Sequence, residues 1–302
     1  MTHDAIIVGG SYAGLSAALA LARARKRVLI IDAGQRRNRF AQSAHGFLGQ
    51  DGRPPGDIVR DGRADVAAYP TVSFIDGTAT AATPTDTGFA VTLADGTTHA
   101  ASRLVLATGL VDELPILPGL REQWGKGVAV CPYCHGYEVA GGRLGVVAFL
   151  PMAAHQALLI RDWGEVTFFP NAIALPDEAT RAALEARGVA IEEGEVAAIA
   201  GEPGHLAGVQ LRDGRTVELD AVFTGVPTRM ASPLPAALGC AFDDSPIGPI
   251  IRIDATMETT VPGVYAAGDA AREPSSIAGA VAGGYLAGVA AHRSLVMSDH
   301  RP

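Results

Sequence analysis

A short apolar strand, a glycine-rich turn and a small-residue helix open the chain and limit its possible folds more than any other feature. Residues 5–8 are apolar, the segment Gly9-Gly10-Ser11-Tyr12-Ala13-Gly14 follows, and residues 13–25 form an Ala/Leu-rich helical pattern before a second apolar strand at 28–31. This order predicts a βαβ unit. A glycine-rich turn at the start of such a helix lets backbone N–H groups and the helix dipole receive a pyrophosphate.

The residues around this turn predict a dinucleotide site, with a strand–turn–helix that binds no nucleotide as the alternative. Asp32 ends the second strand, where a carboxylate can hydrogen-bond a ribose hydroxyl. Ser11 replaces the second glycine of G-x-G-x-x-G and is still small enough for a fairly close backbone approach. We expect the cofactor to contact Gly9, Gly10, Ser11, Ala13, Gly14 and Asp32. The arginines after this strand are either solvated or in contact with a cofactor phosphate: Arg36, Arg37 and Arg39.

The rest of the chain predicts more strands and a second, degenerate βαβ unit. Hairpin strands joined by Asp-Gly turns are expected at residues 72–75, 89–93 and 99–107. From residue 142 the pattern restarts, with strands expected at 144–148, 165–169 and 189–192 and helices at 151–162 and 177–187. Further strands are expected at 209–211, 221–223 and 264–267, and a last helix at 277–292. We therefore place one discontinuous domain at 1–112 plus 230–302 and a smaller inserted one at 113–229.

The stretch that carries the most chemical information is Cys131-Pro132-Tyr133-Cys134-His135-Gly136-Tyr137-Glu138. A C-x-x-C pair at a helix start can cycle between dithiol and disulfide, because the helix dipole lowers the thiol pKa and the thiolate is the nucleophile. His135 adds a group that titrates near physiological pH and can move a proton to or from the thiols. We expect Cys131, Cys134 and His135 to be catalytic.

Three other interpretations of the cysteine pair remain open. C-x-x-C-H is also the pattern of a c-type haem attachment site. A zinc site would need further ligands at metal spacing, and Cys240 is the one other cysteine. The pair can also be two ordinary buried cysteines. Cys240 has apolar neighbours and is expected to be a small core residue rather than a third redox partner.

Charge and composition exclude several classes of protein. The formal net charge of −8 disfavours a nucleic-acid partner, because binding to phosphate backbones is driven mainly by Lys and Arg. Arg23 interrupts the longest apolar stretch, so no segment reaches the roughly 18 residues of a membrane-spanning helix. The first residues lack the features of a signal peptide, so we expect a cytoplasmic protein. In that compartment a C-x-x-C pair is better interpreted as catalytic or metal-binding than as a structural disulfide.

Four segments, in this order, resemble the low-molecular-weight thioredoxin reductase family over essentially the whole chain: residues 9–14, 107–109, 131–134 and 263–269. The resemblance implies FAD as cofactor, a homodimer, and an α/β fold of two Rossmann-like domains. One would be a three-layer ββα FAD domain, and the inserted one a nicotinamide-type domain. It also implies that Cys134 faces the flavin and that Cys131 exchanges with the substrate. Ordinary members have an acid where this chain has His135.

The same resemblance implies further FAD contacts. Gly268 and Asp269 would contact the flavin side chain. Ile277 would bring a backbone N–H at a helix start to the pyrimidine edge of the flavin. His45 falls where relatives contact the ring with Asn, and a structural role for it is the alternative. The remaining implied contacts are Arg39, Ala79, Ala107, Thr108 and Gly109.

Two departures from the family weaken the nicotinamide site. Ala148 and Leu150 stand where the family places glycines that approach the phosphates, so their side chains would crowd a pyrophosphate. Residues 170–172, Pro-Asn-Ala, stand where NADPH-using relatives carry a His-Arg-Arg cluster. We therefore expect the inserted domain to be degenerate as a nicotinamide site.

The cysteine motif and the degenerate site together resemble the dithiol-oxidase branch of the family, of the gliotoxin and holomycin oxidase type. Such enzymes close a small-molecule dithiol to a disulfide and pass the electrons to O2, which yields H2O2; the resemblance implies this use of Cys131 and Cys134, with His135 as base. A disulfide reductase fed by NADPH, ferredoxin or another donor is the main alternative, with a small redox protein as possible partner. A flavin-bound redox sensor or interaction protein is the second alternative. Aromatic residues near the pair either line a substrate pocket or pack: Trp124, Tyr133 and Tyr137.

Overall fold

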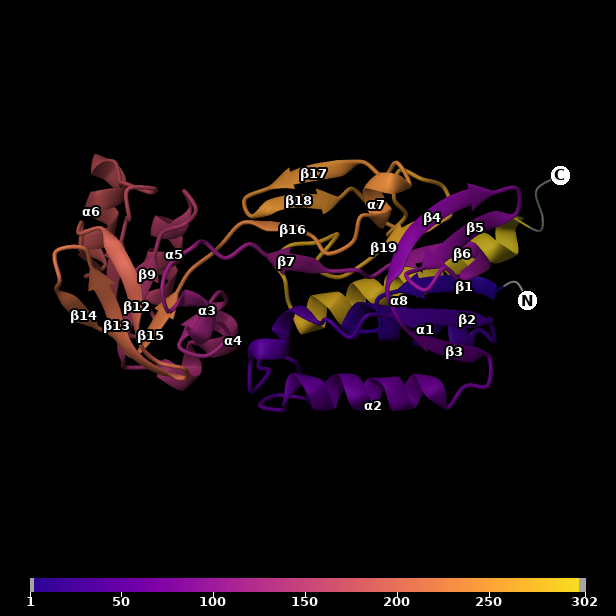
Figure 1. Cartoon of the computed structure of the whole chain (residues 1–302), viewed down its shortest axis with the longest axis horizontal. Helices are drawn as coiled ribbons and strands as arrows, with labels where there is room; N and C mark the ends of the chain where they lie inside the picture. Colours follow the sequence, from indigo (N-terminus) through magenta and orange to yellow (C-terminus); the bar gives the residue numbers. More distant parts are fainter. Residues whose placement is uncertain (1–2, 299–302) are drawn as a thin grey trace.

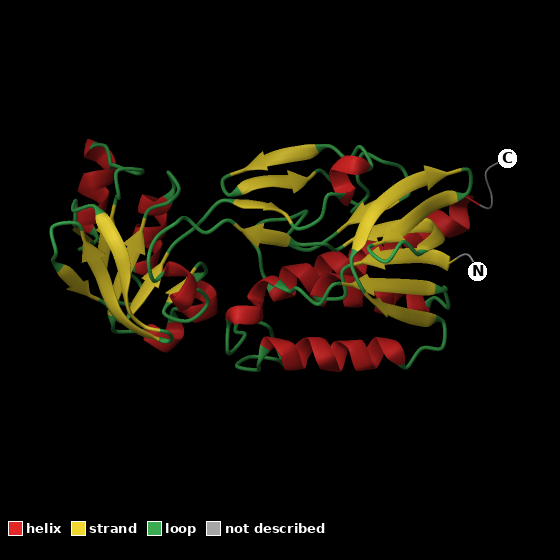
Figure 2. Ribbon diagram, in the orientation of Figure 1, coloured by secondary structure: helices red, strands yellow, loops and turns green. Residues whose placement is uncertain are grey.

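Two lobes, each built on a mainly parallel sheet, make up this computed structural model, which describes residues 3–298 (Figures 1 and 2). The larger lobe, on the right in Figure 1, carries both ends of the described chain. The smaller lobe is formed by the middle of the sequence. No helix within residues 3–298 combines the length and the hydropathy needed to cross a bilayer.

The larger lobe contains a seven-stranded sheet in the order β3-β2-β1-β6-β5-β4, with β19 also paired to β6. Strands β1, β2, β3 and β19 run parallel to their neighbours, whereas β4, β5 and β6 form an antiparallel meander. The strands are β1 (His3–Val8), β2 (Val28–Asp32), β3 (Val72–Asp76), β4 (Ala79–Thr85), β5 (Gly88–Leu93), β6 (Thr98–Leu106) and β19 (Val264–Ala266).

Alternating apolar residues of the parallel strands bury both faces of this sheet. Ile6 and Leu29 pack against the meander, while Ile7 and Ile30 pack against helices on the opposite face. This alternation follows from the two-residue period of a strand. The larger lobe is therefore three-layered, and the α/β class predicted from the sequence is confirmed. Its helices are α1 (Tyr12–Arg23), α2 (Pro55–Ala67), α7 (Leu234–Ala237) and α8 (Ile277–Ser298), with the 3₁₀ turn η1 (Arg37–Phe40).

The expectation that residues 72–75 form a hairpin strand is wrong. They form β3, which runs parallel to β2. Parallel neighbours need a crossover connection, and α2 supplies it. On the side away from β6, β5 pairs antiparallel with β4, a strand that was not expected from the sequence. The turn at 95–96 is confirmed, because it joins the antiparallel strands β5 and β6.

The smaller lobe contains a five-stranded parallel sheet in the order β11-β10-β9-β15-β8 and a three-stranded antiparallel sheet. The parallel strands are β8 (Val128–Ala129), β9 (Arg143–Val147), β10 (Glu165–Phe169), β11 (Ala190–Ile191) and β15 (Ala221–Phe223). The antiparallel strands are β12 (Val196–Glu202), β13 (His205–Leu211) and β14 (Thr216–Glu218). Its helices and 3₁₀ turn are α3 (Leu120–Gln123), α4 (Pro132–His135), η2 (Tyr137–Val139), α5 (Ala153–Ile160) and α6 (Glu178–Ala186).

Both faces of the smaller parallel sheet are also covered. Phe168 packs against α5 and α6, whereas its neighbour Phe169 packs against β12 and β13. The second βαβ unit expected from residue 142 onwards is confirmed, because β9, α5 and β10 follow in that order with β9 and β10 parallel.

Two short strands join the lobes. The chain leaves the larger lobe through β7 (Leu110–Asp112) and returns through β16 (Thr228–Met230), and the two pair antiparallel. A hairpin of β17 (Phe242–Ser245) and β18 (Gly248–Ile251) follows the return. The division into domains at 112/113 and 229/230 falls at this connection and stays a prediction.

Candidate active site

Cys131 and Cys134 form a disulfide in the turn that precedes η2 (their Cα atoms are 5.3 Å apart). Cys131 is the N-cap of α4, whose first residue is Pro132, and the N–H of Cys134 donates back to the carbonyl of Cys131. Proline suits this position because its fixed φ is already helical. The helix has a single turn, so only that turn contributes to the dipole that we expected to lower the thiol pKa. Both cysteines are partly exposed and can be reached by a substrate.

The side chain of His135 lies in a cluster with Glu138 and His45. Burial lowers the pKa of His135 below its ordinary value; Glu138 opposes this shift and His45 adds to it. His45 belongs to the larger lobe, and its imidazole lies 3.4 Å from a carboxylate oxygen of Glu138 and 3.5 Å from one of Asp51. Its expected contact with the flavin ring stays a prediction.

The aromatic residues near the redox pair differ in exposure. Tyr133 and Tyr137 are 69% and 83% exposed, so both are open to a substrate. Trp124 is buried in the core between the two sheets of the smaller lobe, so the pocket role considered for it is wrong and it packs. Trp163, which our sequence analysis did not single out, meets the ring of Tyr133 edge-on with centroids 5.5 Å apart.

The glycine turn between β1 and α1 leaves no room for side chains. Gly9 has φ +107°, and a Cβ placed on it would lie 2.2 Å from the carbonyl oxygen of Ala107. A Cβ on Gly14 would lie 1.8 Å from the carbonyl oxygen of Gly9. Glycine is therefore required at both positions for the tight turn from β1 into the start of α1, the kind of turn that receives a pyrophosphate. Ser11 is the N-cap of α1, and its side chain makes no capping hydrogen bond.

The structure brings the expected cofactor residues together at the carboxyl ends of the parallel strands. Gly10 packs on the side chain of Asp32, and Gly268 packs on Ala13. Ala107 and Thr108 directly follow β6 beside Gly9. Ligands of open α/β sheets bind at this edge. The other expected contacts lie at the start of β4 (Ala79), between β6 and β7 (Gly109), after β19 (Asp269) and at the first position of α8 (Ile277).

Three buried polar atoms in these segments lack a hydrogen-bond partner: Thr108 Oγ1, Arg36 Nε and Asn38 Oδ1. Buried polar groups are nearly always paired, so unpaired ones in the segments around the glycine turn fit a polar ligand. Asn38 was not identified from the sequence; its place after β2 was the available signal. Arg39, an expected contact, is exposed, and its guanidinium lies over the ring of Phe40 at 4.4 Å.

Arg37 is neither solvated nor free for a phosphate, contrary to both alternatives considered. Its guanidinium donates to Asp112 at 2.6 Å and to Asp269 at 3.0 Å. These hydrogen bonds and charges outweigh the partial burial of the side chain and raise the pKa of Arg37. Arg37 therefore fixes the carboxylate of Asp269, an expected flavin contact, relative to β7.

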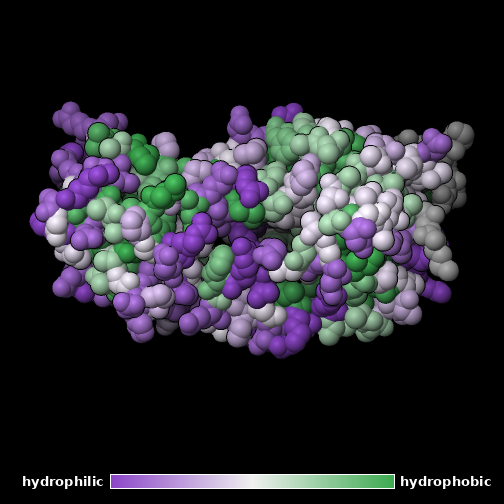
Figure 3. Space-filling view, viewed as in Figure 1, coloured by the Kyte–Doolittle hydropathy of each residue, from purple (hydrophilic) through white to green (hydrophobic). Residues whose placement is uncertain are grey.

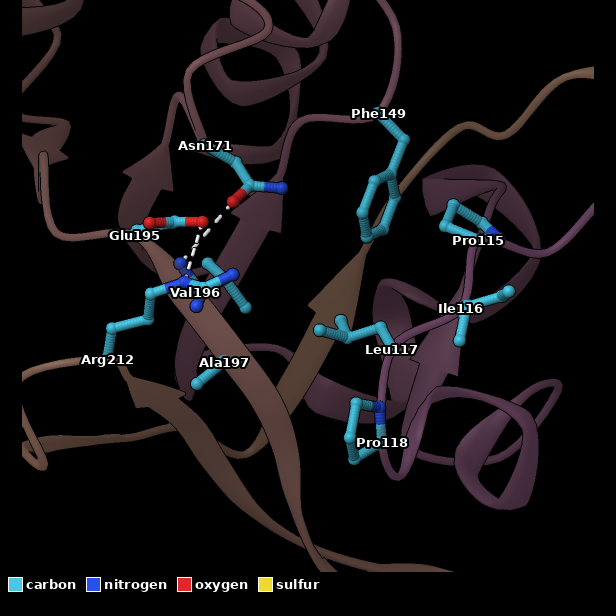
Figure 4. A pocket seen from close by; sticks show the side chains of 10 residues that line it. All are labelled: Pro115, Ile116, Leu117, Pro118, Phe149, Asn171, Glu195, Val196, Ala197 and Arg212. Carbon is cyan, nitrogen blue, oxygen red and sulfur yellow. Dashed lines mark hydrogen bonds and ion pairs between the residues drawn. The ribbon is translucent and has the colours of Figure 1, made fainter.

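The turn after β9, where the family resemblance places a nicotinamide site, carries buried side chains in place of glycines. Ala148 is fully buried, Leu150 is nearly so, and the N–H of Ala148 donates to the carbonyl of Phe169. The side chain of Asn171 lies between the carbonyl of Ala148 and the N–H of Val196. A pocket of about 380 Å³ remains beside the turn (Figure 4). It is lined by Pro115, Ile116, Leu117, Pro118, Phe149, Asn171, Glu195, Val196, Ala197 and Arg212.

A family model for pyridine nucleotide-disulphide oxidoreductases matches residues 3–284. The chain belongs to this family. It is 31% identical over 304 residues to thioredoxin reductase tcpT of Claviceps purpurea, with 97% of this chain and 94% of that protein covered. A solved oxidoreductase from Agrobacterium tumefaciens matches with TM-score 0.94 and 49% identity over 98% of this chain and 99% of that one. HlmI matches with TM-score 0.93 and 37% identity over 99% of this chain and 94% of HlmI.

Membership of the pyridine nucleotide-disulphide oxidoreductases confirms three predictions made from the sequence. The chain is an oxidoreductase, it resembles the thioredoxin reductases, and its cofactor is FAD. The glycine turn, the acid after β2 and the unpaired polar atoms are the features of this chain that fit FAD. Which individual residues contact FAD stays a prediction.

Proposed function

We propose that this disulfide oxidoreductase oxidises a small-molecule dithiol to a disulfide through Cys131 and Cys134, with O2 as the electron acceptor. The observation that carries the proposal is the turn after β9, which has Ala148 and Leu150 where glycines would let phosphates approach the backbone. Both side chains are buried. Arg212 is the one cation among the residues that line the pocket, and it is paired with Glu195 at 2.6 Å.

The reaction balances without a nicotinamide. A substrate thiolate attacks Cys131, and its second thiol then releases the substrate disulfide and leaves Cys131 and Cys134 as a dithiol. FAD, when bound, would supply the two-electron acceptor for this dithiol and the site at which O2 is reduced. The sum is one dithiol and one O2 converted to one disulfide and one H2O2. An imidazole nitrogen of His135 accepts a thiol proton in the first half and holds it beside the redox turn.

Oxygen consumption tests the proposal. Dithiothreitol in air is expected to support steady O2 uptake, with one H2O2 formed per dithiol oxidised, and added catalase should return half of the oxygen. Turnover that needs NADPH, ferredoxin or a disulfide acceptor would favour a reductase, which the names of the thioredoxin reductase relatives support. Absence of turnover, with partner binding that depends on the Cys131–Cys134 oxidation state, would favour a redox sensor.

The pH dependence of this activity should report His135. The imidazole accepts a proton only when neutral, and burial lowers its pKa below the ordinary 6.5, so the neutral form dominates at pH 7. Activity should therefore fall as the pH drops through an apparent pKa below 6.5. In His135→Gln we expect a rate about a hundredfold lower at pH 7 and no acid limb. An unchanged acid limb in this variant would exclude His135 as the base.

The family resemblance also suggests a homodimer, which we include in the proposal. Light scattering of the purified protein would test it, and a monomer mass would remove this part of the proposal.

A further inference from the structure

A loop of the larger lobe lies against the redox turn of the smaller lobe. The N–H of Ala44 donates to the carbonyl of Arg53, and the N–H of Gly52 donates back to Ala44, so the loop between them is closed. A Cβ placed on Gly46 would lie 4.0 Å from the carbonyl oxygen of Tyr133. In Figure 1, α4 lies next to the chain that leads into α2. The loop thus reaches Tyr133, one of the two residues between the cysteines.

A second contact between the lobes joins Phe40, which precedes the loop, to Gly125, which precedes the redox turn. A Cβ placed on Gly125 would lie 2.7 Å from the Cβ of Phe40. On the face drawn in Figure 3, hydrophilic side chains gather along the junction of the two lobes. The rim of the junction is therefore polar on that face.

His45 supplies a polar link at this place. Its side chain is only 20% exposed, whereas those of its partners Asp51 and Glu138 are 69% and 42% exposed. Asp51 also accepts the N–H of Gly46 at 2.8 Å, which ties the imidazole to its own loop. Glu138 follows the redox helix by three residues and belongs to the smaller lobe. The imidazole therefore connects one carboxylate of each lobe.

The same carboxylate faces the proposed base. Glu138 raises the pKa of His135, whereas His45 lowers it. The titratable groups that the structure places around His45, among the residues it describes, are Asp51, Glu138 and His135. A change at His45 should therefore reach both the position of the redox turn and the surroundings of His135.

We propose that His45 and Glu138 are positioning residues that hold the redox turn against the larger lobe, where the flavin binds. The inference rests on the proposed function, because it concerns electron transfer from Cys134 to FAD. With the link intact, the dithiol formed by substrate exchange stays beside the cofactor lobe. Without it, exchange with the substrate at Cys131 continues, but the turn spends more time away from that lobe and flavin reduction slows.

Hydrogen–deuterium exchange of the holoenzyme tests the link without using activity. We would compare His45→Asn, Glu138→Gln and the double variant with His155→Asn, the same change at an exposed position on α5. Each single variant is expected to raise the exchange rate about two- to fivefold in both segments, 41–53 and 131–140, because one partly exposed polar contact contributes little free energy. The double variant should exchange no faster than either single variant, because both substitutions break the same contact. Three results would overturn the proposal: exchange that rises only in the segment carrying the substitution, exchange that does not rise at all, or effects of the two substitutions that add in the double variant.

A kinetic measurement separates this inference from the proposed function. Under anaerobic conditions, rapid quenching follows disulfide formed in the first turnover, while absorbance follows flavin reduction. Both steps are measured at pH 8, where His135 is neutral with or without its neighbours because burial keeps its pKa below 6.5. At this pH we expect His45→Asn and Glu138→Gln to slow flavin reduction about two- to fivefold and to leave first-turnover disulfide formation unchanged. Equal slowing of both steps would overturn the positioning role. If wild-type flavin is not reduced by dithiol at all, the proposed function fails, and the exchange experiment still decides whether the link exists.

Discussion

Cys134→Ser is expected to lower the rate at which a dithiol reduces the bound flavin by about a thousandfold or more. Residues that act as one catalytic unit lose nearly all activity when either is removed. Without Cys134 there is no Cys131–Cys134 disulfide for a substrate thiolate to attack, so Cys131 stays a free thiol. The dithiol that would give two electrons to the flavin is then never formed. Stopped-flow absorbance under nitrogen measures this rate directly.

Cys240→Ser is the matched control, because it makes the same change in the one other cysteine. Cys240 is buried near Thr259, and burial raises the pKa of its thiol, so it remains protonated and unreactive. We expect this variant to reduce its flavin at the wild-type rate, with at most a small loss of stability. Rapid flavin reduction in Cys134→Ser would show that electrons bypass the pair.

Gly9→Ala is expected to yield a protein that binds FAD about a hundredfold more weakly, a loss of about 2.8 kcal/mol. The new Cβ would lie 2.2 Å from a backbone oxygen of Ala107, and a residue other than glycine is strained at φ +107°. The end of β1 must therefore move away from β6 at the turn that receives the pyrophosphate. Flavin fluorescence on titration of the apoprotein measures the affinity.

Substitutions at two other glycines are expected to weaken FAD binding less. In Gly10→Ala the new Cβ would lie 2.8 Å from the Cβ of Asp32. Gly10 does not have the positive φ of Gly9, so its backbone is not strained by alanine and we expect a milder loss. Gly62→Ala, inside α2, meets only a leucine methyl at 3.5 Å and should keep wild-type affinity while stabilising the helix by about 0.5–1 kcal/mol. Wild-type FAD affinity in Gly9→Ala would contradict the placement of the cofactor at this turn.

The elements that the sequence predicted best are those whose local pattern agrees with their packing. β10 has the expected bounds, since its apolar run is buried on both faces. The helix expected at 177–187 forms because Asp177 caps it through the N–H of Thr180. The three cofactor motifs meet as expected, because each ends or follows a parallel strand and those ends share one edge of a sheet.

The elements that the sequence did not reveal depend on contacts distant in the chain. Helix α2 has a polar sequence with two glycines and buries only Pro55, Ile58 and Val66, so its pattern is weak. β12 consists largely of small residues and is defined by its pairing with β13. The pairing of Arg37 with Asp269 and that of His45 with Glu138 each join segments that no local motif connects.

The measurement that tests the central claim most directly is flavin absorbance under nitrogen, after mixing with NADPH and, separately, with dithiothreitol. We predict rapid bleaching by the dithiol, no rapid bleaching by NADPH, and recovery with H2O2 formation when air is admitted. Rapid bleaching by NADPH would contradict the account, because it would mean that the turn at Ala148 and Leu150 accepts a nicotinamide cofactor and that the protein works as a reductase.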